Sequence, residues 1–285
     1  MTATIVNGKE IAKELRKKIA DEITILKKKY RVSPSLTTII IGHDPSSALY
    51  LKLRDNSCAE VGIISTHLAC EPKVSEQKVL QAIQKLNTDD SVHGILVQYP
   101  VPKHLSQEKF MSTVDPRKDI EGFNPVNMGR TLIGDEHLVP CTPLSVLTIL
   151  NHEHIDVKGK DVVIVNHSNI LGKPLVALLL NRNATVTVCH VFTKNLKQYT
   201  SKADILITGA GVQNLITPDH VKQDAVVIDV GIVETKGGVC GDVEFNTVKE
   251  KASVITPVPG GVGPVTIACA LANMFKTYKN CVENK

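Results

Sequence analysis

The sequence predicts an α/β protein with two α/β domains, the second of them a doubly wound unit of the Rossmann type. The 285 residues exceed what one hydrophobic core usually serves. Short runs rich in β-branched residues alternate with helical patterns in both halves of the chain, as in sheets with crossover helices. A polar segment at 112–142 separates the two patterns. We predict a first domain at 1–143 that includes a C-terminal helix at 264–285, and a second domain at 144–263.

The composition is that of a globular protein and excludes several classes of function. Hydrophobic residues make up 42% and charged residues 22% of the chain. No apolar run is long enough to cross a bilayer, and the N-terminus lacks the apolar core of a secretory signal. A formal net charge of +4 and the absence of Trp do not favour nucleic acid. We therefore expect a small-molecule partner, with no membrane and no nucleic acid.

The seven cysteines show no paired close spacing, and most stand among apolar residues. This pattern favours reduced core residues in a cytoplasmic protein over a zinc site or a disulfide framework.

The first half of the chain alternates helix and strand. Asn7 is expected to cap a long helix, because apolar residues follow it at helical spacing. A second helix is expected to begin at Pro45, with Asp44 as its cap, and to end at Gly62. Three strands and one further helix complete the pattern: strands at 36–42, 63–69 and 92–100, and a helix at 75–86.

Two places in this half could hold a ligand. Tyr50 and Arg54 stand four residues apart, so they project from one helix face. Gln98 closes the third strand, and ligands of such sheets bind beyond the carboxyl ends of strands. The alternatives are an exposed Tyr–Arg pair and a polar residue at a strand end.

The segment 112–142 is polar, rich in turn residues and too irregular for a long element. Long connections of this kind in compact domains are usually functional or disordered, and its interspersed apolar residues argue against disorder. Asp119 and Glu121 are the acids of interest among those in this segment, although most acids in loops are only solvated.

A second alternating unit follows a helix at 142–152. The loop Asn166–Pro174 lies between a strand and a helix, where a dinucleotide would meet a helix N-terminus. It lacks the GxGxxG pattern, so this signal alone is weak. The string PVPGGVGP at 257–264 indicates a rigid loop with exposed backbone, or else a simple linking turn. A last helix from Pro264 is expected to pack back on the first domain.

Taken together, these strings resemble the methylenetetrahydrofolate dehydrogenase/methenyltetrahydrofolate cyclohydrolase family over essentially the whole chain. The strings that carry the resemblance are Gly42–Gly62, GILVQ at 94–98, PRKDIEGF at 116–123, PCTP at 140–143, GKP at 172–174, HVFTKNL at 190–196 and PGGVGP at 259–264. The resemblance implies a folate cleft between the domains, NADP as the usual cofactor, a homodimer formed through the nucleotide domain, and a place in one-carbon metabolism and purine biosynthesis.

The resemblance also implies a reaction and a set of site residues. Family members oxidise the methylene bridge of tetrahydrofolate by hydride transfer and then hydrolyse the methenyl cation, without a metal. The implied catalytic residues are Tyr50, Arg54, Gln98 and Glu121. The implied substrate-binding residues are Tyr50, Val97, Gln98, Tyr99, Glu121, Pro259, Gly260 and Gly261. The implied cofactor-binding residues are Asn166, His167, Ser168, Gly172, Pro174, His190, Val191 and Ile232.

Several of these positions depart from the family pattern. Arg54 stands where the family has a lysine, and a guanidinium cannot cycle a proton. Glu121 stands where the family has Asp, which moves the carboxylate one methylene further out. In the cofactor region, His167 and Val191 replace residues that commonly bind a ribose phosphate.

Three interpretations follow: the ordinary bifunctional enzyme, a dehydrogenase with an impaired or lost hydrolysis step, and a catalytically weak folate-binding relative. The first is favoured because nearly all of the strings are intact. Within it, Arg54 predicts that hydrolysis is the weaker activity. His167 and Val191 predict poor discrimination of NADP from NAD.

Overall fold

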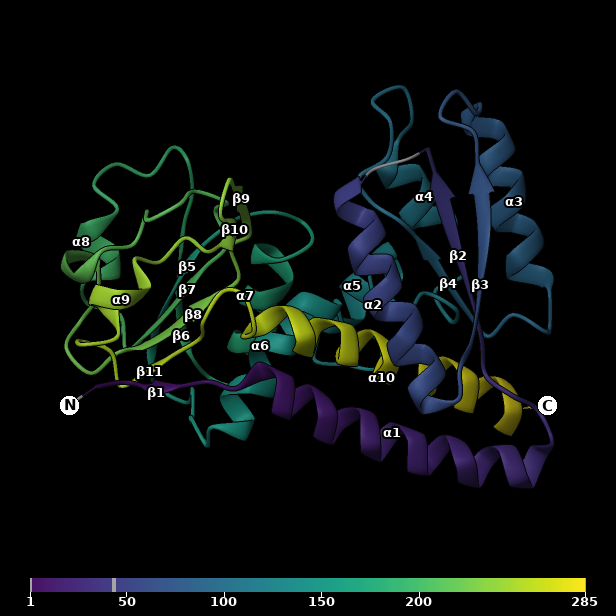
Figure 1. Cartoon of the computed structure of the whole chain (residues 1–285), viewed down its shortest axis with the longest axis horizontal. Coiled ribbons are helices and arrows are strands. Elements are labelled where there is room, and N and C mark those ends of the chain that lie inside the picture. Colours follow the sequence, from purple (N-terminus) through teal and green to yellow (C-terminus); the bar gives the residue numbers. More distant parts are fainter. Residues whose placement is uncertain (1, 43–44, 285) are drawn as a thin grey trace. The chain divides into compact units, whose positions relative to one another are not determined.

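The structure, a computed structural model, describes residues 2–42 and 45–284, apart from the side chains of residues 45–50. The chain forms two compact units (Figure 1). Unit 1 comprises Met1–Ala12, Thr131–Asp135 and Thr142–Thr266, and unit 2 comprises Lys13–Arg130, Glu136–Cys141 and Ile267–Lys285.

Unit 2 is built on a three-stranded parallel sheet in the order β3-β2-β4. The strands are β2 (Ser35–Ile41), β3 (Ile64–Cys70) and β4 (Gly94–Val97). The helices with residues in this unit are α1 (Gly8–Tyr30), α2 (Pro45–Val61), α3 (Glu76–Thr88), α4 (Gln107–Thr113), α5 (Pro125–Leu132) and α10 (Val262–Glu283).

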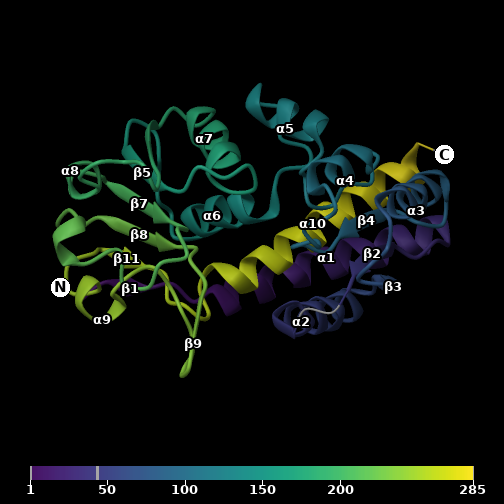
Figure 2. The ribbon, with the colours of Figure 1, turned by 90° about the horizontal axis from the view of Figure 1, so that it is seen from above.

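Two apolar clusters cover the two faces of this sheet. On one face, α1, α2 and α10 pack around Leu36 and Leu96. On the other face, α3 and α4 pack around Ile39 and Ile95, and Phe110 is fully buried there. Figure 2 shows α2 on the opposite side of the strands from α3 and α4. The alternation of buried side chains along β2 and β4 thus places one set of residues on each face.

Unit 1 is built on a six-stranded parallel sheet in the order β1-β11-β8-β7-β5-β6. Its strands are β1 (Thr4–Ile5), β5 (Asp161–Val165), β6 (Thr185–Cys189), β7 (Ile205–Thr208), β8 (Val226–Asp229) and β11 (Val254–Ile255). The other elements are α6 (Cys141–His152), α7 (Gly172–Leu180), α8 (Lys197–Thr200), the 3-10 turn Pro218–His220, α9 (Phe245–Val248) and the hairpin β9 (Val233–Thr235) and β10 (Gly238–Cys240).

Helix α7 packs on one face of this sheet, and α8 and α9 border the other (Figure 1). In the sheet, β6 lies on one side of β5. The strands β7, β8 and β11 follow one another on the other side of β5. The order therefore reverses between β5 and β7. In open α/β sheets this switch point, at the carboxyl ends of the strands, is where ligands bind.

The predicted elements are confirmed, with boundary changes. Asn7 Oδ1 accepts a hydrogen bond from Glu10 N at 3.2 Å, as expected of a helix cap. Gly62 ends α2 with a φ of +81°. The predicted cap Asp44 lies outside the described residues.

Several features differ from the expectations. Helices α4 and α5 were not expected, because the segment around them shows no clear period. Helix α10 begins at Val262, inside the string predicted to exclude helix, and Pro264 falls in its first turn, where a missing N–H is tolerated. Strand β1 pairs with β11, so the first residues join unit 1, although the predicted boundary placed them in the first domain.

Helix α10 packs with unit 2 as expected, and Tyr278 Oη donates to the Val32 carbonyl at 2.7 Å. All seven cysteines, each within the described part of the chain, are free thiols. Across residues 2–42 and 45–284, no three His, Cys, Asp or Glu side chains are grouped to hold a metal ion. No helix within those ranges is long and apolar enough to span a bilayer.

Candidate functional site

Arg54 is the centre of the polar cluster in unit 2. It is 1% exposed, which makes it one of the largest fully buried side chains of the chain. Its Nη2 donates to Thr38 Oγ1 in β2 at 3.0 Å, and its Nη1 donates to Gln98 Oε1 at 3.5 Å. Gln98 directly follows β4 and donates from Nε2 to the Tyr99 carbonyl at 3.0 Å. The guanidinium thus joins α2 to the strands β2 and β4.

Glu121 lies in the same unit and lines a small cavity of about 10 Å³, which is room for about one water molecule. Val97, Tyr99 and Asp119 line this cavity too. The structure therefore brings three predicted site residues, Val97, Tyr99 and Glu121, together at one cavity.

Burial raises the pKa of Glu121 from 4.5 to about 7, the positive charge of Arg54 lowers it in part, and the negative charge of Asp119 raises it. The side chain keeps some contact with solvent. A carboxyl group in this range can take up and release a proton near neutral pH. The pKa of the Tyr99 phenol is raised well above its ordinary value by burial, so Tyr99 stays protonated.

Asp119 anchors the backbone on which Glu121 stands. Its Oδ1 accepts from the amides of Glu121 and Gly122 at 3.2 and 3.0 Å, and its Oδ2 accepts from Asn124 N at 2.8 Å and Asn127 Nδ2 at 3.0 Å. It is 5% exposed. With both oxygens used in this way, Asp119 organises the loop, as hydrogen-bonded buried carboxylates commonly do.

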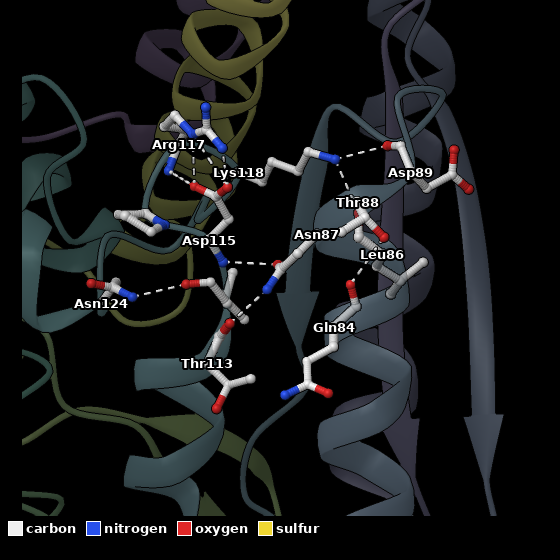
Figure 3. Close-up of polar contacts among 12 residues, drawn as sticks. Gln84, Leu86, Asn87, Thr88, Asp89, Thr113, Asp115, Arg117, Lys118 and Asn124 are labelled. Atoms are coloured by element: carbon white, nitrogen blue, oxygen red, sulfur yellow. Dashed lines mark hydrogen bonds and ion pairs between the residues drawn. The ribbon is translucent and has the colours of Figure 1, made fainter.

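A second set of contacts fastens this loop to the end of α3 (Figure 3). Lys118 Nζ donates to the carbonyls of Leu86 and Asp89 at 3.0 and 2.7 Å. The side chain of Asn87 donates to the Thr113 carbonyl and accepts from Asp115 N at 2.7 and 2.8 Å. Lys118 is buried, which lowers its pKa, and its charge faces the carbonyl end of the helix dipole.

Replacing Lys118 with Met is expected to lower the free energy of unfolding by about 2–4 kcal/mol, because it leaves the last carbonyls of α3 without a buried cationic donor. Denaturant unfolding measures this change. The control is Lys109→Met, which removes an exposed ion pair with Glu76 and should cost less than about 1 kcal/mol. Equal losses in the two variants would contradict the assigned role of Lys118.

Four of the predicted substrate-binding residues are not found at this cavity. Three belong to unit 1, and the side chain of the fourth is not described. The side chain of Tyr50 is among those that the structure does not describe. Pro259, Gly260 and Gly261 belong to unit 1, where Gly261 N donates to the Pro257 carbonyl at 2.9 Å and closes a tight turn. Gly260 has a φ of +105°, and Gly261 is buried.

In unit 1, Asn166 organises the loop between β5 and α7. Its Oδ1 accepts from Ser168 N and Ser168 Oγ, both at 2.8 Å, and from Gly172 N at 3.1 Å. Its Nδ2 donates to the Gly209 carbonyl at 2.6 Å, after β7. Asn166 therefore links the two loops on either side of the switch point.

The other predicted cofactor residues fall into an exposed and a buried group. The rings of His167 and His190 lie in contact, with centroids 4.8 Å apart and planes tilted by 43°. Val191 is 82% and Ile232 67% exposed. Gly172 and Pro174 are buried in α7, where they shape the start of the helix.

Exposed apolar side chains gather in the loops after the carboxyl ends of four strands of this sheet. They are Ile170 after β5, Val191 and Phe192 after β6, Val212 after β7 and Ile232 after β8. Exposed apolar groups at the switch edge of such a sheet are typical of a cofactor site, because a bound dinucleotide covers them.

Two buried acids at this edge were missed from the sequence. Asp242 is fully buried and accepts from Thr208 Oγ1, Ala210 N and Val212 N at 2.7, 2.5 and 2.9 Å. Asp229 accepts from Gly231 N, and burial raises its pKa to about 6. The two carboxylates thus hold the loops after β7 and β8. An acid inside the apolar run AVVIDVGI was the signal that could have revealed Asp229.

Comparison with known proteins identifies the family. The model of the tetrahydrofolate dehydrogenase/cyclohydrolase catalytic domain matches residues 6–121, and the model of that family's NAD(P)-binding domain matches 140–282. The chain belongs to the tetrahydrofolate dehydrogenase/cyclohydrolase family. Membership makes it an enzyme of folate metabolism, with the two activities that name the family.

Three relatives illustrate this similarity. The bifunctional protein FolD of Methanosarcina barkeri is 48% identical over 279 residues, which cover 98% of this chain and 96% of that protein. The crystal structure of FolD from Campylobacter jejuni is 42% identical with a TM-score of 0.95, covering 98% of this chain and 99% of that one. The Trypanosoma brucei enzyme, solved with NADP and an inhibitor, is 32% identical with a TM-score of 0.94, covering 98% of each chain.

These findings confirm the family and the two-domain α/β fold that the sequence predicted. They do not favour the alternatives in which hydrolysis is impaired or lost or the protein is a catalytically weak folate-binding relative, because the similar proteins of high identity are named as bifunctional.

Proposed function

We propose that this protein oxidises methylenetetrahydrofolate with NADP and hydrolyses the resulting methenyl cation to formyltetrahydrofolate. The observation that carries this proposal is that Gln98, which Arg54 hydrogen-bonds, lies in the chain between Val97 and Tyr99, two residues that line the Glu121 cavity, in the part of the chain that matches the catalytic domain. The Trypanosoma brucei relative was solved with NADP, which favours the same cofactor here.

In this proposal the folate lies over the end of β4. Val97, Gln98 and Tyr99 border it, and Gln98 hydrogen-bonds the reacting region while Arg54 holds the Gln98 side chain. Tyr50 and the turn Pro259–Gly261 are proposed to contact the folate as well. The positive charge of Arg54 suits an anionic substrate and keeps part of the Glu121 population ionised.

Glu121 is proposed to carry the proton in the hydrolysis. Water adds to the methenyl carbon and loses a proton to the carboxylate. One proton then reaches the nitrogen whose bond to that carbon breaks, and the remaining hydroxyl proton leaves as the carbonyl of the formyl group forms. Two protons thus leave the water oxygen and one is taken up by nitrogen, so the overall reaction releases one proton. Among the described side chains at this cavity, the Tyr99 phenol stays protonated and Asp119 is already saturated by the loop. A carboxyl with a pKa of about 7 meets the requirement of a general base at neutral pH.

The cofactor is proposed to bind at the switch edge of the sheet in unit 1. Asn166 and Ser168 shape the loop, and the exposed His167, His190 and Val191 stand where a ribose and its phosphate would lie. Ile232, with Gly172 and Pro174 behind the loop, completes the proposed set. When bound there, NADP supplies the hydride acceptor for the oxidation.

We further infer a homodimer formed through the nucleotide-binding domain, in the cytoplasm, that supplies formyl groups to purine biosynthesis without nucleic acid or membrane partners. We also propose that residues 1–143 and 264–285 form the folate-binding catalytic domain. Residues 144–263 then form the NAD(P)-binding domain. Light scattering after gel filtration tests the dimer, because a monomer at micromolar concentration would contradict it.

The proposed function is tested by assaying both half-reactions on the purified protein. Reduction of NADP with methylenetetrahydrofolate and decay of added methenyltetrahydrofolate are each followed by absorbance. Turnover in both assays is expected, and the absence of hydrolysis at any pH from 6 to 9 would refute the proposed bifunctionality.

We predict that NADP is poorly distinguished from NAD, because imidazoles and Val191 stand where a permanent cation would pair with the phosphate. Val191→Arg is expected to lower the KM for NADP about tenfold and to change the KM for NAD less than about threefold, since a guanidinium binds phosphate bidentately. The control is Leu180→Arg, which adds the same charge at the end of α7, away from the carboxyl ends of the strands. A strong NADP preference of the unmodified protein at pH 8 would contradict the prediction.

A further inference from the structure

Asn273 is a fully buried amide in α10 that reaches two distant segments of unit 2. Its Nδ2 donates to the Ile120 carbonyl at 2.9 Å and to the Val139 carbonyl at 2.8 Å. Cys141 Sγ donates to the same Ile120 carbonyl at 3.2 Å. One side chain of the C-terminal helix therefore fastens segments that are 153 and 134 residues away along the chain.

Both segments adjoin Glu121. Ile120 directly precedes Glu121, so the carbonyl bonded by Asn273 belongs to the peptide that carries the Glu121 nitrogen. On the other side, Gly122 has a φ of +72°, and a Cβ added there would stand 2.6 Å from the Val139 backbone. The Glu121 backbone is thus held between α10, the segment ending at Val139 and the carboxylate of Asp119.

The hydrogen bonds of this amide add little net stability to the fold, so stabilisation does not explain its presence. Its partners are the two carbonyls and, at 3.6 Å, Cys141 Sγ, so the nitrogen must face them. The Asn273 Oδ1 is then buried with no hydrogen-bond partner among the described residues. Two hydrogen bonds contribute about 1 kcal/mol each, and a buried unpaired carbonyl costs about 1–3 kcal/mol. The net is near zero, and an apolar side chain of this size would fill the same space without the unpaired oxygen.

We propose that Asn273 is a positioning residue for hydrolysis, which holds the peptide before Glu121 so that its carboxylate keeps its place in the cavity. This inference rests on the proposed function of Glu121. An error of about 1 Å in the placement of a catalytic group can cost about 10²-fold in rate. Loss of the Asn273 amide leaves the Ile120 carbonyl with only the weak Cys141 thiol donor, which lets the start of the Glu121 side chain shift.

The test compares Asn273→Leu with the matched control Asn280→Leu. Asn280 stands two turns further along α10 and hydrogen-bonds His137 Nε2 at 2.7 Å, away from Glu121. In Asn273→Leu, kcat for hydrolysis is expected to fall about 10- to 100-fold, with KM changed less than about threefold. The pH midpoint of hydrolysis should move below 7, because water reaches a loosened carboxylate more easily. The charged or titratable groups that interact electrostatically with this carboxylate are unchanged in the variant. They are Arg54, Asp119, Tyr99 and Cys141.

The outcomes separate a positioning role from a structural one. If Asn273→Leu loses both half-reactions in proportion to its folded fraction, with the pH midpoint unchanged, the proposal is overturned. Asn273→Ser keeps one hydroxyl donor, and it replaces Asn273→Leu in the test if the Leu variant does not fold. It should retain more hydrolysis than Leu where both fold, and full wild-type kcat and midpoint in the Ser variant would also overturn the proposal. Failure of the proposed function would be distinguishable from these outcomes, because the unmodified protein itself would then show no hydrolysis.

Discussion

Replacing Glu121 with Gln is expected to lower kcat for hydrolysis by about 10²–10⁴-fold and to remove the pH dependence centred near 7. Gln has nearly the shape of Glu but cannot accept a proton. Oxidation should suffer less, because it does not require a base at this position. Stopped-flow decay of methenyltetrahydrofolate between pH 5.5 and 9 measures the effect.

The same substitution should stabilise the fold above pH 7. The folded-state pKa of Glu121 lies above its ordinary value, so the folded protein holds a proton that the unfolded chain has lost between about pH 4.5 and 7. Stability therefore falls as pH rises through this window, by at most about 3 kcal/mol, less where water reaches the carboxylate. Glu121→Gln is expected to raise the unfolding free energy more at pH 8 than at pH 5.

The exposed Glu71 supplies the control, since Glu71→Gln should change neither hydrolysis nor its pH profile. Retention of hydrolysis by Glu121→Gln within tenfold of wild type, with the pH midpoint in place, would falsify the role of Glu121 as the proton carrier. Greater stability together with lost activity would show that the loss is not caused by misfolding.

Replacing Arg54 with Gln is expected to raise the pH midpoint of hydrolysis by about one unit, because the guanidinium charge lowers the pKa of Glu121. A rise of about one unit reduces the ionised fraction at pH 7 from about one half to about one tenth. Because the group is fully buried, its loss should also cost about 3–5 kcal/mol of stability. Rate profiles and denaturant unfolding of the same preparation measure both changes.

Arg54→Lys separates charge from geometry. Lysine keeps the positive charge, so the midpoint should stay near 7, but one ammonium cannot reproduce the planar fork that spans Thr38 and Gln98. The rate of hydrolysis should rise, because an ammonium at this position can cycle a proton and a guanidinium cannot. A fall in rate would show that the placement of Gln98 by the guanidinium matters more. A midpoint that is unchanged in Arg54→Gln would show that the two groups are not electrostatically linked.

The sequence predicted most of the fold because its periodic patterns are local. The β-branched runs of β2 and β5, the Asn7 cap and the Gly62 stop each follow from neighbouring residues. Strand β1 escaped prediction because two residues carry no period, and only the open edge of β11 explains its place. Helices α4 and α5 escaped because the segment around them holds many turn residues.

The candidate site, like the fold, could be predicted from the sequence only in part. Arg54, Gln98 and Glu121 could be selected from residue type and motif. Nothing in their spacing reveals that a guanidinium joins β2 to Gln98 after β4, or that its charge lowers the pKa of a carboxyl that burial has raised to about 7. Asp229 and Asp242 were missed because buried acids look ordinary until their donors are known.

By itself the sequence determined the order of helices and strands, the division into two α/β units and the family, since these depend on local periodicity and on contiguous strings. Only the tertiary structure decided the environment of each charge and the hydrogen bond from Asn273 to the Ile120 carbonyl, 153 residues away along the chain. Burial and long-range hydrogen bonds arise between segments that the chain brings together only on folding, and these contacts set the pKa and the position of a side chain.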